Sequence, residues 1–201
     1  MTDWEDQYRR GETPWDKGAP APPLVDFLAR ASLHGDILVP GCGLGHDVRA
    51  LASQPMPPGE TRVLGVDVSS AAIRAAEAVP PAGEESYRVG DLFALPAEIV
   101  GAFDWVVEHT CFCAIDPARR SDYVRAVHAA LRPGGRLLAI FYLNPHDPGE
   151  DRTGPPFESN VAELDELFSP WFTRLEEYRP ARSYPGREGR ELVRLLEKKV
   201  L

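Results

Sequence analysis

The stretch "VPGCGLGHDV" (39–48) constrains the fold of this chain more than any other part of its sequence. The apolar run "DILVPG" (36–41) leads into it, and a helical pattern follows it. Three glycines in five residues allow a tight turn, and they let a ligand approach the backbone without a Cβ in the way. The helix N-terminus after the turn favours a negatively charged group. We therefore predict a strand–turn–helix unit that binds a ligand at its turn.

Further apolar runs predict strands at 61–68, 86–92, 103–110 and 136–143, with helical patterns between them. Such alternation predicts a parallel sheet with helices on both faces. The last two strand patterns, 172–180 and 191–200, are too close for a parallel crossover, so they must pair antiparallel. We expect an α/β, Rossmann-like, seven-stranded mixed sheet with one reversed strand. It forms a single domain, 1–201, with an N-terminal arm at 1–19.

Composition narrows the class of protein. The net charge of −9 over 201 residues argues against a nucleic-acid surface, which needs clustered Lys and Arg. The apolar runs are too short to span a bilayer, and the acidic, aromatic N-terminus does not resemble a signal peptide. Three cysteines, an odd number, are typical of a reducing compartment. We predict a cytoplasmic protein with a small-molecule substrate. The sequence makes no prediction of the oligomeric state.

Two acids stand where neighbouring strands end. Asp67 ends the second predicted strand and Asp91 the third. An isolated aspartate is more often a helix cap or a turn residue. Here both acids and the glycine turn meet at the carboxyl edge of the sheet, where open α/β folds bind ligands. This favours a nucleoside cofactor. A nicotinamide cofactor is disfavoured, because the third glycine of its fingerprint would fall at His46.

At this point the chain resembles a known family. The segments "WEDQYRRGETPWDKG" (4–18), "VPGCGLGHD" (39–47), "CFCAIDPARR" (111–120) and "TGPPF" (153–157) are similar to the thiopurine S-methyltransferase family, within the class I S-adenosylmethionine-dependent methyltransferases. That family includes halide and thiol methyltransferases, and the similarity extends from Trp4 to about Gly189. It implies S-adenosylmethionine as cofactor and methyl transfer to a small soft nucleophile, above all a thiol.

The resemblance also implies roles for single residues. Gly41 would contact the methionine part of the cofactor, and we include Gly43 of the same turn in the cofactor site. Asp67 would bind the ribose hydroxyls. Asp91 and Leu92 would flank the adenine.

The aromatic arm would act as a lid over the cofactor. The resemblance places Trp4 and Trp15 there, and we add Tyr8, where related plant enzymes carry a tryptophan. Aromatic faces stabilise a cation such as a sulfonium, and a lid excludes water. A packed N-terminal arm without this function is the alternative.

His109, near the end of the fourth predicted strand, is the candidate catalytic residue. The resemblance places it beside the cofactor, at a position where the related plant enzymes carry tyrosine and the mammalian thiopurine enzyme carries arginine. An imidazole there could accept the proton of an incoming thiol. The alternative is a histidine that only packs beside the adenine.

The three cysteines could form a metal site, because the predicted topology brings Cys42, Cys111 and Cys113 close together. Three thiolates could hold zinc or arsenic(III), which would suit an arsenic or tellurium methyltransferase. Alternate residues of an extended segment do not converge on one ion, however, and cysteine often packs as a small hydrophobe. We therefore expect no metal site. A cofactor-binding protein without catalytic activity is a further alternative.

Overall fold

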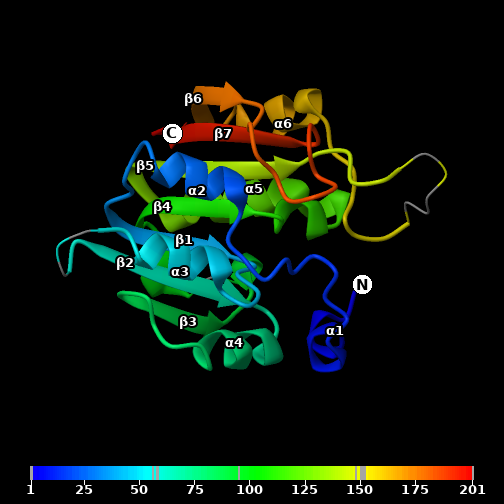
Figure 1. Cartoon of the computed structure of the whole chain (residues 1–201). Helices are drawn as coiled ribbons and strands as arrows, with labels where there is room; N and C mark the ends of the chain where they lie inside the picture. The colour runs from blue at the N-terminus through cyan, green and yellow to red at the C-terminus, as the bar shows by residue number, and fades with distance from the viewer. Residues whose placement is uncertain are drawn as a thin grey trace.

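The fold is built around one mixed sheet with the strand order β3-β2-β1-β4-β5-β7-β6 (Figure 1). The computed structural model describes residues 2–200 except 56, 58, 95, 148 and 150–152. The first five strands are parallel, and β7 is antiparallel to both of its neighbours, β5 and β6. The predicted fold class is thereby confirmed. The strands are β1 (Gly35–Pro40), β2 (Thr61–Asp67), β3 (Glu85–Val89), β4 (Phe103–His109), β5 (Leu131–Tyr142), β6 (Phe172–Tyr178) and β7 (Glu191–Lys198).

Helices cover both faces of the sheet, as the alternating pattern predicts. In Figure 1, α2 and α3 lie in front of the strands and α5 lies behind them. The helices are α1 (Trp4–Arg10), α2 (Pro22–Leu28), α3 (His46–Ala52), α4 (Ser70–Glu77), α5 (Arg120–Ala130) and α6 (Val161–Phe168). Short 3₁₀ turns are η1 (Leu92–Ala94), η2 (Ala97–Ile99), η3 (Phe112–Ala114) and η4 (Pro117–Arg119).

The two faces of the sheet bury separate hydrophobic cores. Successive strand residues point to opposite faces, so Val106 and Val107 of β4 belong to different cores. Val107 packs in the core that includes Leu24 of α2 and Leu51 of α3. Val106 packs in the core that includes Val124 of α5. Because both faces are covered, β4 is apolar on both sides and its end is held rigidly in place.

Two predicted strand boundaries need adjustment. The third strand ends at Val89, so Asp91 lies two residues beyond it rather than in it. β5 already begins at Leu131, because Leu131 pairs with Phe103 before a register shift in the ladder. Side chains cap several of the helical segments: Asp116 caps the 3₁₀ turn η4 that precedes α5, Ser69 caps α4 and Asn160 caps α6.

The carboxyl edge of the parallel strands is the functional side of the fold. Figure 1 shows α1 beyond the tips of these strands. Because β7 is reversed, its first residue, Glu191, pairs with Tyr142 at the end of β5. A segment close to the C-terminus therefore reaches the same edge as the glycine turn.

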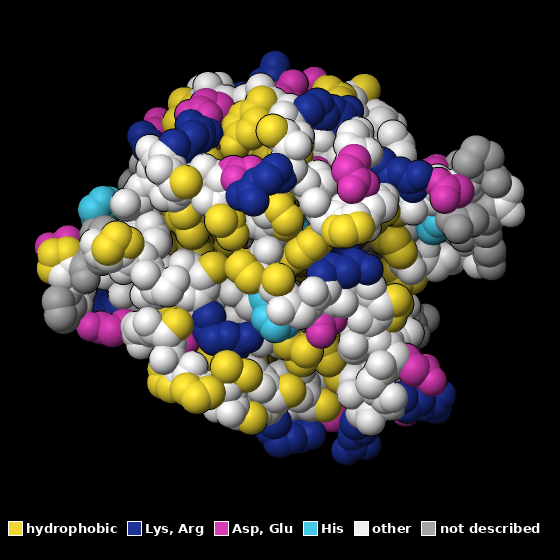
Figure 2. All heavy atoms as spheres, in the orientation of Figure 1, with side chains coloured by type: hydrophobic (Ala, Val, Ile, Leu, Met, Phe, Trp, Pro, Cys, Tyr) yellow, Lys and Arg dark blue, Asp and Glu magenta, His cyan; other side chains and the backbone are white. Residues whose placement is uncertain are grey.

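The surface mixes side chains of all kinds. On the face shown in Figure 2, hydrophobic side chains gather along and below α2, and basic side chains lie beside acidic ones. One such pair joins Arg182 to Asp26 of α2. No helix in the described part of the chain is long and apolar enough to cross a membrane.

Candidate active site

The glycine turn between β1 and α3 leaves no room for side chains. Gly41 has φ +60°, and a Cβ there would lie 2.9 Å from the sulfur of Cys111. Gly43 has φ +53°, and its Cβ would lie 2.7 Å from the hydroxyl of Tyr8. Both positions therefore require glycine, for conformation and for space. The turn is enclosed by the loop after β4 on one side and by the N-terminal arm on the other.

Asp67 ends β2 beside this turn. The N–H of Gly43 donates to Asp67 Oδ2 at 2.9 Å, and the N–H of Ser69 donates to Oδ1 at 2.9 Å. Burial raises the pKa of Asp67, although these N–H bonds oppose the shift. A carboxylate has about four acceptor sites, so Asp67 can still accept a bond from a ligand hydroxyl.

Asp91 and Leu92 follow β3 at the same edge. Asp91 Oδ1 accepts the N–H of Phe93 at 2.9 Å and so shapes the turn η1. Leu92 is nearly buried and belongs to the core under α5. The guanidinium of Arg119 stacks 3.8 Å above the ring of Phe93. The predicted contact of Asp91 and Leu92 with adenine stays a prediction.

Three aromatic residues of the N-terminal arm form one cluster. Trp4 and Trp15 pack edge to face with their ring centroids 5.3 Å apart, and Tyr8 packs against Trp15 at 5.7 Å. The indole N–H of Trp15 donates to the Tyr8 hydroxyl at 3.1 Å. Since that hydroxyl lies against Gly43, the cluster stands directly over the glycine turn, where a lid would lie.

Glu5 fastens this arm to the domain, a role that no sequence pattern predicts. Its carboxylate accepts the N–H of Ala71 at 3.0 Å and the hydroxyls of Ser69 at 2.8 Å and Ser70 at 3.0 Å. These groups form the first turn of α4, where helices bind anions. The Ala71 N–H bond is the largest of the causes that lower the pKa of Glu5 to about 2. Glu5 therefore holds α1 against α4 as an anion.

A buried carboxylate, that of Glu108, fixes the loop after β4. Glu108 accepts the N–H of Phe112 at 2.9 Å and the hydroxyl of Tyr123. Burial raises the pKa of Glu108. Thr110 has φ +63°, a rare conformation for a β-branched residue. Such strain is tolerated where the surroundings fix the backbone, and it clusters at functional sites.

His109, at the end of β4, is held between two charged residues. Its Nδ1 lies 2.8 Å from Asp47 Oδ2, and its Nε2 lies 3.3 Å from Arg187 Nη1. A guanidinium can only donate, so in this contact Nε2 accepts, and Nδ1 carries the hydrogen that faces Asp47. Burial alone would raise the pKa of Asp47, but His109 and the N–H of Ala21 hold it below its usual value.

Arg187 and Glu191 complete what we call the buried charge cluster: Asp47, His109, Arg187 and Glu191. The guanidinium of Arg187 stacks 4.6 Å from the ring of Tyr142 and 5.3 Å from that of Tyr184. Glu191 is fully buried, and Oε1 lies 3.6 Å from Arg187 Nη1 and 3.9 Å from His109 Nε2. Neither oxygen of Glu191 has a hydrogen-bond partner. These residues come from distant parts of the sequence and meet at the carboxyl edge.

The surroundings of the three cysteines bear on the possibility of a metal site. All three are free, and burial raises the pKa of each thiol, to about 12 for Cys113. Within the described ranges, no three His, Cys, Asp or Glu side chains are placed to hold a metal ion. The thiol of Cys113 points to the carbonyl of Thr110, and Cys42 packs against the α2–α3 core. The three-cysteine alternative finds no support in this arrangement.

The residues at the glycine turn fit S-adenosylmethionine. The turn needs glycine at 41 and 43, which leaves bare backbone for the methionine part. Asp67 offers carboxylate lone pairs for the ribose. The Trp4–Tyr8–Trp15 cluster places aromatic rings above the turn, where they suit a sulfonium cation.

Fold and site together define a class I S-adenosylmethionine-dependent methyltransferase. The sheet order with its reversed strand is that of the class. The solved structure of 1,6-didemethyltoxoflavin-N1-methyltransferase from Burkholderia thailandensis, with bound S-adenosylhomocysteine, superposes with a TM-score of 0.73 at 23% identity, over 98% of this chain and 86% of that chain.

A family model identifies the family of this chain within that class. The model of the family described as Thiopurine S-methyltransferase (TPMT) matches residues 1–200, so the chain belongs to this family. It is similar to Probable thiol methyltransferase 2 of Arabidopsis thaliana, at 34% identity over 83% of this chain and 71% of that protein. It is also similar to Thiocyanate methyltransferase 1 of the same plant, at 33% identity over 94% of this chain and 81% of that protein.

The sequence predictions include the glycine turn, Asp67 and His109, but they miss the other members of the charge cluster. Asp47 stands in the quoted motif "VPGCGLGHD", and it could have been noticed as a polar residue at a helix start. Arg187 and Glu191 lie in a stretch that the sequence presents as solvated basic turn and strand. No local sequence pattern indicates that Arg187 and Glu191 are buried at the site.

Proposed function

We propose that this methyltransferase transfers the methyl group of S-adenosylmethionine to the sulfur of a small thiol. The observation that carries the proposal is the guanidinium of Arg187, held between the rings of Tyr142 and Tyr184 at the carboxyl edge. A guanidinium is weakly hydrated, and aromatic rings are polarisable, so together they suit a large, soft sulfur on which negative charge collects. The names of relatives, which include thiol and thiocyanate methyltransferases, support this choice.

In this proposal the two sides of the site have separate tasks. Bound S-adenosylmethionine supplies an electrophilic methyl group on a sulfonium sulfur. The glycine turn and Asp67 fix its orientation, and the aromatic lid of Trp4, Tyr8 and Trp15 excludes water. Arg187 and His109 hold the acceptor sulfur at the end of β4. Positioning and water exclusion then provide most of the rate enhancement, because a thiolate is already a strong nucleophile.

A substrate screen tests the proposal. Calorimetry first measures S-adenosylmethionine binding, and the protein is then incubated with thiols, halides, thiocyanate and arsenite. Release of S-adenosylhomocysteine is followed together with the mass of the methylated product. We expect thioethers from small thiols. Tight cofactor binding with methyl transfer only to arsenite, or to no acceptor at all, would overturn the proposal.

A further inference from the structure

The buried charge cluster contains one carboxylate that the described residues leave without a hydrogen bond. Glu191 has no exposed surface, and both of its oxygens lack a hydrogen-bond partner. Its nearest cationic group, Arg187 Nη1, lies at 3.6 Å, too far for a hydrogen bond. A buried carboxylate is costly unless its lone pairs are satisfied, so a group of this kind needs an explanation.

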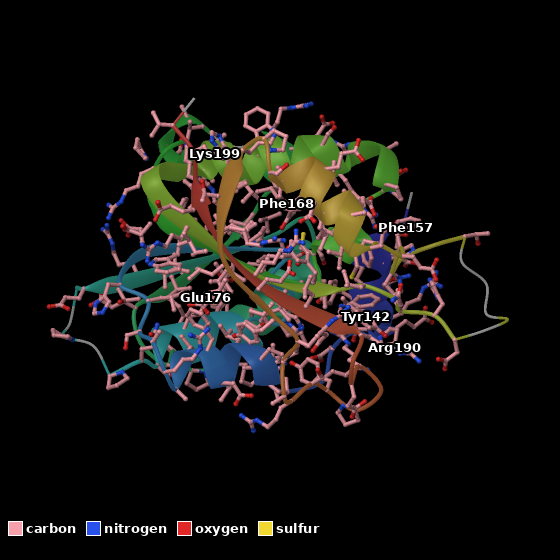
Figure 3. All side chains as sticks on the ribbon, turned by 90° about the horizontal axis from the view of Figure 1, so that it is seen from above. Tyr142, Phe157, Phe168, Glu176, Arg190 and Lys199 are labelled. Carbon is pink, nitrogen blue, oxygen red and sulfur yellow. The ribbon has the colours of Figure 1, made fainter. Side chains whose placement is uncertain are left out.

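The position of Glu191 points to the methyl acceptor. It begins the reversed strand β7 at the carboxyl edge, opposite Tyr142 of β5. Figure 3 shows Tyr142 and the neighbouring Arg190 at the same end of the sheet, far from Lys199 at its other end. The side chain of Glu191 lies on the face of the sheet that also carries His109, 3.9 Å from its Nε2. Glu191 therefore lies beside His109, in the part of the proposed site that the cofactor would not fill and where the methyl acceptor would bind.

His109 is less free than Glu191 to take a proton. Its Nδ1 is engaged with Asp47, and its Nε2 already accepts from Arg187. Protonation of Nε2 would break its hydrogen bond with Arg187, because the Nε2–H group and the guanidinium N–H group would then both be donors. The oxygens of Glu191 have free lone pairs and no donor to displace.

From this geometry we propose that Glu191 accepts the thiol proton, and that the cluster thereby selects proton-bearing thiols over preformed anions. The proposal rests on the proposed function. As the thiol sulfur forms its bond to the methyl carbon, the electron pair of the broken carbon–sulfur bond stays on the cofactor sulfur. The thiol proton passes to the Glu191 carboxylate. The products are a thioether, neutral S-adenosylhomocysteine and a protonated Glu191.

The charge of the cluster explains the selectivity. The cluster sets two carboxylates, Asp47 and Glu191, beside one guanidinium, that of Arg187. A neutral thiol enters without adding charge, and its proton then neutralises Glu191. Iodide or thiocyanate would bring a further negative charge beside these carboxylates, which a site of low dielectric disfavours.

The test compares Glu191→Gln with the wild type on two probes, 2-mercaptoethanol and iodide. Gln keeps the shape and removes the base. We expect kcat/KM for 2-mercaptoethanol to fall about 100-fold, within the usual range for the loss of a general base, while kcat/KM for iodide rises because the variant lacks one carboxylate charge. The deficit with the thiol should shrink as the pH approaches the pKa of the free thiol, and Glu191→Asp should recover part of the activity. His109→Gln serves as comparator, and we expect it to keep the wild-type pH dependence with the thiol.

A readout without turnover complements the kinetics. Thiophenol is titrated into the complex with S-adenosylhomocysteine, and its thiolate absorbance is followed with pH. Below the pKa of free thiophenol, where the free ligand carries its proton, the wild type should release no proton to buffer when thiophenol binds as thiolate, whereas Glu191→Gln should release one. Equal loss of thiol and iodide turnover, or identical proton release in both proteins, would overturn the proposal. If the wild type methylates no thiol at all, the proposed function itself fails. Melting curves and cofactor binding of Glu191→Gln confirm that the variant is folded.

Discussion

The two halves of the proposed site consist of different kinds of groups. The half that we assign to the cofactor uses backbone: a turn that requires glycine at 41 and 43, and the N–H groups that Asp67 holds in place. The half that we assign to the acceptor uses buried charged side chains, Asp47, His109, Arg187 and Glu191, with few exposed atoms. Backbone geometry suits a ligand that is the same throughout a class of enzymes. Side chains can be exchanged singly, so the acceptor half is the part that adapts to a particular substrate.

Replacement of Asp67 should have the largest effect on the cofactor half. Asp67→Asn keeps the shape but weakens the bonds to the ribose hydroxyls. Hydrogen bonds to a charged group contribute about 1.5–3 kcal/mol, so the Kd for S-adenosylmethionine should rise about 100-fold. Calorimetry measures the change, and a melting curve without cofactor controls for damage to the Gly43 and Ser69 contacts. Unchanged affinity would show that the cofactor binds elsewhere.

Replacement of Arg187 should affect only the acceptor half. Arg187→Lys keeps the charge but loses the planar stacking on Tyr142 and Tyr184 and the bond to His109. We expect kcat/KM for a thiol to fall on the order of 30-fold, as for a lost hydrogen bond to a charged group. The Kd for S-adenosylmethionine should change less than about twofold. If cofactor affinity fell as much as kcat/KM for the thiol, the site could not be divided into a cofactor half and an acceptor half.

Replacement of Glu5 should weaken the docking of the N-terminal arm, the proposed lid. Glu5→Gln removes the anion that binds the first turn of α4, and on the order of fivefold weaker cofactor binding should follow. In the wild type, the pKa of Glu5 is lowered from 4.5 to about 2. A carboxyl lowered in this way stabilises docking above its ordinary pKa and loses the effect as the pH falls through the folded value.

The fluorescence of Trp4 and Trp15 reports this docking. The signal assigned to docking should change between about pH 4.5 and about pH 2 in the wild type, and it should already be altered at neutral pH in Glu5→Gln. Identical spectra and cofactor affinity for the two proteins would remove Glu5 as the anchor.

The cysteines should matter least. Burial raises the pKa of the thiols of Cys111 and Cys113, which disfavours their thiolate forms. Cys111→Ser/Cys113→Ser should change the Kd for S-adenosylmethionine less than about twofold and lower the melting temperature slightly, because buried sulfur is replaced by hydroxyl. A large loss of activity that added metal restores would revive the metalloid alternative.

The same division explains how far the sequence predicts the molecule. The cofactor half follows from local patterns: a glycine turn after an apolar run, and acids where strands end. The reversed strand follows from the short spacing of the last two strand patterns. The acceptor half depends on tertiary packing. Glu191 and Arg187 look like solvated charges in the sequence, and only the pairing of β7 with β5 buries them beside His109.

The anchoring of the lid was hidden for a similar reason. Glu5 lies in an acidic, exposed-looking helix, and its partners on α4 are more than sixty residues away. No periodicity connects the two. The aromatic residues of the same arm were predictable only through the family resemblance, and their role over the cofactor stays a prediction.

The most direct test of the central claim is the stoichiometry of one reaction. The wild-type protein is incubated with S-adenosylmethionine carrying a labelled methyl group and with thiophenol, and both products are quantified by mass spectrometry. We predict one labelled methyl thioether for each S-adenosylhomocysteine formed, with neither product in the absence of protein. S-adenosylhomocysteine without the labelled thioether, or no product despite cofactor binding, would contradict the assignment of a thiol methyltransferase.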